Sequence, residues 1–180
     1  KRGDGQKRHK KIVLKRKNYA EADKILTIFS KQKGKIVALA KGIRRINSKR
    51  APTLELFNQI KAYIVKGRGF DLITDVETIK NFSKIQKKLT TISVTYYLVE
   101  LIEKLTAENQ ENLPIYRLLI EVLEKIEKKG NLNQTEINDF QKILLVSLGF
   151  GLPKTVNQRN LDEFIENILN KKINSRRFLW

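Results

Sequence analysis

Five cationic residues fall within ten positions of one stretch of the chain. They are Lys41, Arg44, Arg45, Lys49 and Arg50, and Pro52 follows them. A polar segment that ends in proline is typical of an exposed loop. Arginine donates paired hydrogen bonds to phosphate and stacks on nucleobases, and lysine adds positive charge. The spacing therefore predicts a loop that binds the phosphate backbone of a nucleic acid; solvated surface charge is the alternative interpretation.

Other residues at neighbouring positions extend this hypothesis. The further cations that we expect on the same face are Lys15, Arg16, Lys17, Lys66 and Arg68. The aromatic residues Tyr19, Phe57, Tyr63 and Phe70 are candidates for stacking on bases, as aromatic side chains do in barrels that bind single strands. Aromatic residues of a small barrel also build its core, and that is the competing expectation for each of the four.

Residues with the chemistry of an active site or a metal centre are scarce. The one histidine, His9, lies in a polar N-terminal segment, and the chain contains no cysteine. The acids Asp23, Asp71, Asp75 and Glu77 do not have the spacing of a metal or glycosidase pair. The segment 67–69 (GRG) lacks the Lys-Ser/Thr context of a phosphate-binding loop and predicts a hairpin turn. We therefore expect a protein without catalytic activity, metal or cofactor.

The positive charge is concentrated in one part of the chain. Of the net charge of +18, residues 1–80 carry +15, whereas residues 81–180 carry +3. A protein with this charge repels itself unless a polyanion neutralises it, and nucleic acid is the commonest such partner. An anionic membrane surface is the rival, but these cations fall on predicted strands and loops rather than on an amphipathic helix. We expect neither a transmembrane helix, which needs ~18 consecutive apolar residues, nor a secretory signal.

Short apolar runs before residue 80 predict the β-strands that would hold these loops. Residues 1–10 contain no apolar anchor and predict a flexible basic arm. Strands are expected over residues 12–14, 24–30, 35–40, 54–66 and 70–76. A flat sheet of such short strands could not bury its own apolar face. The strands therefore indicate a small closed barrel over residues 11–80. The OB-fold is the leading candidate for a five-stranded barrel, and an SH3-like barrel is the runner-up.

After Lys80 the apolar residues recur at the three- and four-residue steps of a helix face. The pattern predicts helices with apolar positions over residues 85–102, 115–126, 137–148 and 161–169. Asn133 or Thr135 is a candidate cap for the third of these helices. The predicted fold class is therefore mixed: an N-terminal five-stranded OB-fold β-barrel is followed by an all-α helical domain over residues 81–180.

Several segments resemble the RecO family of bacterial DNA repair and recombination mediator proteins. Residues 12–23 (IVLKRKNYAEAD) resemble its opening strand, and residues 25–45 continue through its second and third strands to the ending Ala-Lys-Gly-x-Arg-Arg. Residues 144–153 (LLVSLGFGLP) are similar to the exit of its third helix, and residues 173–179 (INSRRFL) to its C-terminal signature. The chain departs from many members because it lacks the cysteines of their zinc module, and it is short for the family.

The resemblance implies a cytoplasmic, nucleoid-associated protein that binds single- and double-stranded DNA. It implies strand annealing and the loading of recombinase onto DNA coated with single-strand-binding protein, with RecR as a protein partner. It also implies that the helical domain captures the acidic C-terminal tail of single-strand-binding protein. Such a tail needs an apolar pocket flanked by cations, because burying an unpaired carboxylate is costly. The candidate cations are Arg117, Lys142 and Lys154 around the second and third helices, and Arg176 and Arg177 as a second set.

The residues are also compatible with two other functions. An RNA-binding or ribosome-associated OB-fold protein would have the same charge and the same barrel, and competition between single-stranded DNA and RNA would distinguish it. An interaction scaffold would use the helical domain and carry the charge incidentally. Weak affinity for phosphate even in low salt would indicate the scaffold.

Overall fold

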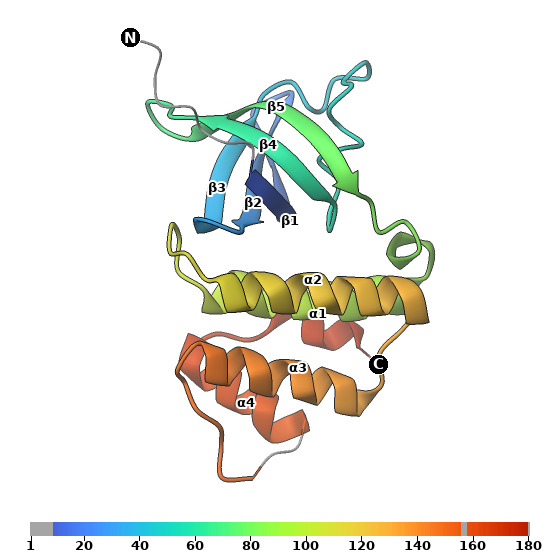
Figure 1. Cartoon of the computed structure of the whole chain (residues 1–180), viewed down its shortest axis with the longest axis vertical. Helices are drawn as coiled ribbons and strands as arrows, with labels where there is room; N and C mark the ends of the chain where they lie inside the picture. The colour runs from blue at the N-terminus through green and yellow to red at the C-terminus, as the bar shows by residue number, and fades with distance from the viewer. Residues whose placement is uncertain (1–8, 156–157, 180) are drawn as a thin grey trace. The chain divides into compact units, whose positions relative to one another are not determined.

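The computed structural model describes residues 9–155 and 158–179, which fall into two compact units. The first unit consists of the described residues up to Asn81 together with Glu108–Leu113. The second consists of Phe82–Ala107 and the described residues from Pro114 onward. Figure 1 shows strands in the first unit and helices in the second. Within the described ranges, no helix has both the length and the apolar character that crossing a bilayer requires.

A closed five-stranded barrel forms the first unit and confirms the predicted OB-fold. The strands are β1 (His9–Tyr19), β2 (Asp23–Ser30), β3 (Gly34–Ala40), β4 (Gln59–Val65) and β5 (Asp71–Lys80). Around the barrel they follow the order β1-β2-β3-β5-β4, and β1 pairs with β4 to close it. The β3–β5 pair is parallel and the other pairs are antiparallel. A closed barrel has no free sheet edge, so a partner chain cannot bind by adding a strand to the sheet.

The core of the barrel comes from side chains that alternate along the strands. Leu26 and Ile28 in β2 and Ile60 and Ala62 in β4 all lie in one buried apolar cluster. Alternate residues of a strand point to opposite faces, and in β2 the second face is covered as well, because Thr27 and Phe29 are also buried. A register shift after Val13 interrupts this alternation in β1 and leaves the four residues 11–14 buried in succession.

The structure corrects several predicted strand boundaries. β1 begins at His9, so the last two residues of the predicted arm pair with β4, while residues 1–8 lie outside the described part of the chain. β4 begins at Gln59 and not at residue 54. Leu54 and Phe57 belong to the β3–β4 loop but are buried, so they imitate the apolar pattern of a strand. Asn58 closes this loop, because its Nδ2 donates to the carbonyl oxygens of Pro52 and Thr53 at 2.9 and 3.1 Å.

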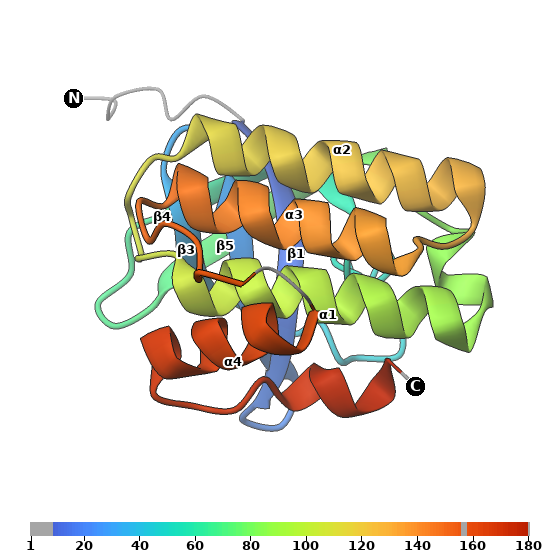
Figure 2. The ribbon, with the colours of Figure 1, turned by 90° about the horizontal axis from the view of Figure 1, so that it is seen from below.

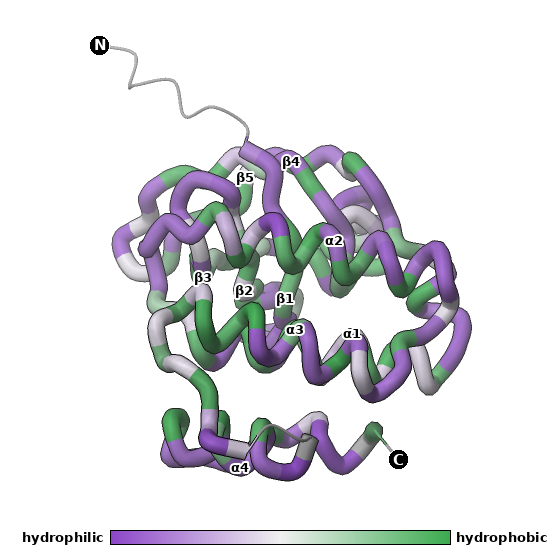
Figure 3. Tube along the Cα trace, turned by 60° about the horizontal axis from the view of Figure 1, so that its bottom comes forward, coloured by the Kyte–Doolittle hydropathy of each residue, from purple (hydrophilic) through white to green (hydrophobic). Residues whose placement is uncertain are grey.

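Four helices form the second unit and confirm the predicted helical domain. They are α1 (Leu89–Leu105), α2 (Leu113–Lys129), α3 (Gln134–Ser147) and α4 (Gln158–Leu169), with short 3-10 turns at Ile85–Lys87 and Asn174–Phe178. Within this unit α1 and α2 form one layer and α3 and α4 a second, with axes that run roughly side by side (Figures 1 and 2). Apolar and polar segments alternate along the helices (Figure 3). Buried apolar residues such as Leu98 and Leu144 build the core of this unit.

Two helix starts show how local chemistry sets the boundaries. Asn133 caps α3, because its Oδ1 accepts a hydrogen bond from the Glu136 amide at 2.9 Å while Glu136 Oε2 accepts one from the Asn133 amide at 2.8 Å. This reciprocal capping box satisfies two amides that the helix itself leaves unpaired, and it confirms Asn133 as a cap. By contrast, Ile85 lies in a 3-10 turn ahead of α1, so the predicted start of that helix was too early.

Candidate nucleic-acid interface

The predicted cationic loop is the first part of the connection between β3 and β4, and residues 41–50 are called the basic loop here. Hydrogen bonds from two backbone amides fix it to the β1–β2 turn and to the first residue of β2. The Gly42 amide donates to Asp23 Oδ1 at 2.7 Å, and the Arg44 amide donates to the Ala22 carbonyl at 2.9 Å. Gly42 has a φ of +67°, a conformation that glycine adopts without steric cost. The start of the basic loop is therefore anchored to the barrel.

A series of turns continues from this anchor. Amides donate to carbonyls three residues earlier at Arg45 to Gly42, Ser48 to Arg45 and Ala51 to Ser48, over 3.2, 3.0 and 3.3 Å. Ile43 packs in the barrel core and so fixes the position of the chain between these turns. Side chains on such a scaffold lose less conformational freedom on binding than those of an open loop. The cations of the basic loop are consequently presented on an ordered backbone.

Two of the predicted arginines serve the fold. Arg50 donates from Nη1 to the Ile73 carbonyl at 2.9 Å and from Nη2 to the Lys41 carbonyl, which ties the basic loop to β5 and to its own start. Arg16 forms an ion pair with Glu55 at 2.6 Å between Nη1 and Oε1, and its side chain is mostly buried. These guanidinium groups fasten the loop to the barrel, and their predicted role as DNA contacts stays a prediction.

The remaining predicted cations of this region are exposed. Lys15 and Lys17 lie on β1, Lys41, Arg44, Arg45 and Lys49 lie on the basic loop, and Arg68 lies in the β4–β5 turn. Arg44 Nη1 donates to the Ala20 carbonyl at 3.3 Å, which places this guanidinium beside the β1–β2 turn. Burial, with the charges of Arg16 and Arg44, lowers the pKa of Lys24 although Glu55 opposes the shift. Arg16 and Arg44 therefore lie close enough to Lys24 to add to the effect of its burial.

An exposed aromatic pair lies close to the same turn. The rings of Tyr19 and Phe70 meet edge to face with centroids 5.7 Å apart, and 44% and 38% of these residues are exposed. Arg44 reaches the residue that follows Tyr19, so cations and aromatic rings share this end of β1. Phe57 is buried and Tyr63 is half-buried, which leaves Tyr19 and Phe70 as the stacking candidates.

One residue of this surface was not predicted from the sequence. Ile46 is fully exposed in the basic loop, between Arg45 and Lys49. An isoleucine in an otherwise polar segment gives no periodic signal, so only the fold shows that this side chain is left in solvent.

Lys66 belongs to the wall of a cavity in the barrel to which the basic loop contributes no residue. Lys11, Lys33 and Asn109 line the same cavity. Lys11 was not among the predicted site residues, because a lysine beside an apolar strand gives no sign that it will be buried. Among the described residues, no group of three or more histidine, aspartate or glutamate side chains is placed to hold a metal ion.

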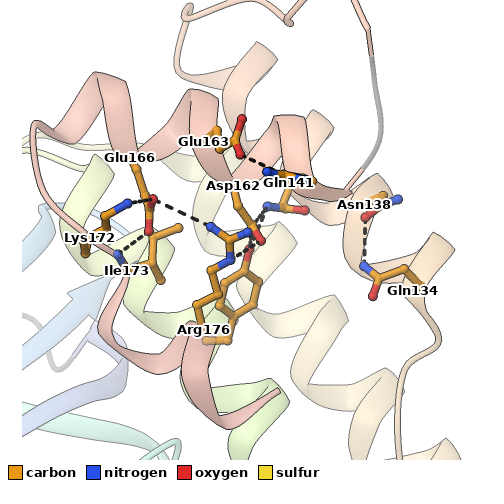
Figure 4. A network of polar contacts seen from close by, with 11 residues as sticks. Gln134, Asn138, Gln141, Asp162, Glu163, Glu166, Lys172, Ile173 and Arg176 are labelled. Atoms are coloured by element: carbon orange, nitrogen blue, oxygen red, sulfur yellow. Dashed lines mark hydrogen bonds and ion pairs between the residues drawn. The ribbon is translucent and has the colours of Figure 1, made fainter. Parts of the chain in front are cut away.

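The cations predicted to bind a partner tail differ in their surroundings. Arg176 Nε forms an ion pair with Asp162 Oδ2 at 3.0 Å, and Asp162 is almost fully buried. Gln141 donates to Asp162 Oδ1 at 2.9 Å, and the Tyr97 hydroxyl donates to the same atom, so Arg176 completes a buried polar network (Figure 4). Lys142 pairs with Asp139 at 3.2 Å on α3. Arg117, Lys154 and Arg177 are exposed, and the role predicted for this set stays a prediction.

Comparison with known proteins relates most of the chain to one family. The family model described as Recombination protein O N terminal matches residues 6–82, and Recombination protein O C terminal matches residues 86–156. The chain is 30% identical over 139 residues to the DNA repair protein RecO of Symbiobacterium thermophilum, which covers 77% of this chain and 55% of that relative. It is 34% identical over 125 residues to the DNA repair protein RecO of Bifidobacterium longum, covering 68% and 52%. The chain thus spans about half the length of these curated relatives.

Proposed function

Because the chain belongs to the RecO family of recombination proteins, we propose that it acts in recombinational DNA repair by binding DNA at the basic loop. The observation that carries this proposal is the ordered, exposed set of cations anchored to a closed barrel. Phosphate contacts of this kind supply most of the affinity of proteins that bind without sequence preference. The charge of +15 on residues 1–80 is appropriate to such a partner.

The neighbouring apolar groups suit single-stranded DNA. Bases that stack on Tyr19 or Phe70 would contribute about 1–3 kcal/mol each, with little dependence on sequence. Ile46 projects from the basic loop as an apolar side chain between cations. Side chains of this kind insert between base steps in several DNA-bending proteins. Lys41, Arg45 and Lys49 would hold the phosphates while these groups contact the bases.

Strand annealing follows from contacts that hold the backbone. Phosphate contacts position a strand but leave the hydrogen-bonding edges of its bases free. Two strands held in this way on basic surfaces would be concentrated and still able to pair. We infer that the protein anneals strands and helps to load recombinase onto DNA coated with single-strand-binding protein, with RecR as its partner.

Removing the exposed cations of the basic loop tests the proposal. We expect Lys41→Ser/Arg45→Ser/Lys49→Ser to weaken binding of a fluorescent single strand by tenfold or more. The slope of log K against log salt should become shallower by about 2, since each contact to a single strand contributes ~0.7. Thermal stability should change little, because exposed charges contribute little to folding.

A matched variant of the helical unit is the control. Lys87→Ser/Lys88→Ser/Lys128→Ser removes the same charge from exposed positions. If both variants lose the same affinity, net charge and not the basic loop determines binding. Stronger binding of RNA than of DNA with the same sequence would indicate an RNA-binding protein instead.

A further inference from the structure

A cavity of about 220 Å³ opens within the barrel unit, and none of its lining residues belongs to the basic loop. Its wall includes Lys11 from β1, Ser30 from β2, Lys33 from the β2–β3 turn and Asp71 from the start of β5. An apolar cavity of ~150 Å³ can hold benzene, so this one has room for a small polyatomic ion.

The wall is held in place by close backbone contacts. The Asn109 amide donates to the Lys35 carbonyl at 2.8 Å, which attaches the segment Glu108–Leu113 to the β2–β3 hairpin. Gly34 has a φ of +61°, and a Cβ there would lie 1.8 Å from the Gln110 carbonyl oxygen. No other residue fits that approach, so the cavity has a fixed side formed by a segment distant in sequence.

Lys11 is the unusual group in this cavity. The residue is 4% exposed, and its Nζ donates to the carbonyl oxygens of His9 and Ala62, each at 3.0 Å. Both acceptors are neutral, and no described carboxylate forms an ion pair with it. Desolvation and the nearby charge of Lys33 lower the pKa of Lys11 to about 8. Two cations therefore share a confined space, where desolvation and mutual repulsion disfavour their charged forms. An entering anion would offset both effects.

The geometry points to a binding site for a phosphate group, held by Lys11 and Lys33 with donors from Ser30 and Asn109. Ser30 is buried on the wall and provides a hydroxyl. The carboxylate of Asp71 repels an anion without a proton but accepts a hydrogen bond from one that carries a proton. Phosphate keeps a proton at neutral pH and sulfate does not, so the cavity should prefer phosphate.

Two sources share this chemistry. Inorganic phosphate needs only the cavity itself. The terminal phosphate of a DNA strand would deepen the function proposed above, and that part of the inference rests on it. A terminal monoester loses its last proton with a pKa of about 6, so a strand end should bind better below that pH.

Titration calorimetry of the full chain with inorganic phosphate tests the site. We expect saturable binding of one phosphate, at least tenfold weaker sulfate binding, and loss of that preference in Asp71→Asn. Lys11→Met should reduce phosphate affinity tenfold or more while the protein stays folded, because methionine fills the space without burying a charge. Lys10→Met removes an exposed charge from the adjacent position of β1 and should bind normally.

The pH dependence and the source of the phosphate complete the test. Binding should weaken as the pH rises above about 8, where Lys11 loses its proton; His9, Lys33, Lys66 and Asp71 are the other ionisable groups on the wall. Strands with a 5′-phosphate and a 5′-hydroxyl, compared near pH 6, separate a strand end from the free ion. The basic-loop variant should still bind inorganic phosphate, so failure of the DNA interface would leave this site standing. Equal phosphate affinity of Lys11→Met and the parent, or no saturable binding by the parent, would overturn the inference.

Discussion

The cations of this chain differ in whether they form hydrogen bonds and ion pairs within the protein. Arg16 and Arg50 donate to carbonyl or carboxylate oxygens of the β3–β4 loop and the barrel, and Arg176 neutralises a buried aspartate. A planar guanidinium with five donors can satisfy several acceptors at once, which an ammonium group does less well. The arginines of a basic surface are therefore not equivalent candidates for DNA contact, and we expect substitutions at Arg50 to affect folding as well as any binding.

Lys11 gives a residue-scale prediction for stability against pH. Its pKa in the folded protein is about 8, below the ordinary value of 10.5, so the unfolded chain binds more protons between those two pH values. The free energy of unfolding should therefore increase as the pH rises through this window. We expect an increase of ~2 kcal/mol, because water in the cavity reduces the effect of the shifted pKa. Chemical denaturation at several pH values measures this. The rise should be absent in Lys11→Met, and an equal rise in that variant would assign it to other groups.

At the scale of single elements, the capping box of α3 is the clearest local determinant. Hydrogen bonds from Lys129, the Asn133 amide and Lys125 lower the pKa of Glu136 to about 2. The contribution of this carboxylate to the free energy of unfolding is therefore present above the ordinary pKa of 4.5 and is lost as the pH falls toward 2. Glu136→Ala should destabilise the protein by about 1 kcal/mol at neutral pH in urea unfolding. The difference from the parent should shrink near about pH 3. Glu121→Ala, at an exposed position of α2, should change stability much less.

The same elements show what the sequence could predict. Helix faces and the cap at Asn133 were predictable because they depend on residues three and four positions apart. The basic loop was predictable as a cluster, since its cations are adjacent in the chain. Its anchoring was not, because the contacts of Gly42, Arg44 and Arg50 join it to Asp23, Ala20 and Ile73 far away in sequence. The buried Lys11 was missed for the same reason: barrel register and a distant segment create its cavity.

For the whole molecule, the net charge is distributed unevenly between the two parts of the chain. The barrel region carries most of the net charge, and residues 81–180 are nearly balanced. If the barrel binds DNA as proposed, we expect the nearly neutral helical part to compete little for the DNA backbone and to be available for the predicted protein partner. Four exposed apolar side chains support such a role: Ile143, Val146, Phe150 and Leu152 lie on α3 and just after it, between Lys142 and Lys154. Arg176 pairs with the buried Asp162, whereas Lys142 pairs with the exposed Asp139. We therefore favour this end of α3 over the C-terminal arginines for binding a tail.

The acidic tail of single-strand-binding protein is the partner that this surface should bind. A fluorescent peptide with acidic residues and an apolar C-terminal residue should bind the full chain with micromolar affinity, roughly −7 to −8 kcal/mol. Amidation of the peptide carboxylate should abolish binding, because the cations would lose the charge that they recognise. Arg117→Ala/Lys142→Ala/Lys154→Ala should weaken binding tenfold or more, whereas Arg177→Ala should have little effect. The reverse result would place the tail at the C-terminal segment, and a folded protein with no affinity for the peptide would leave the exposed apolar residues of α3 to a different partner.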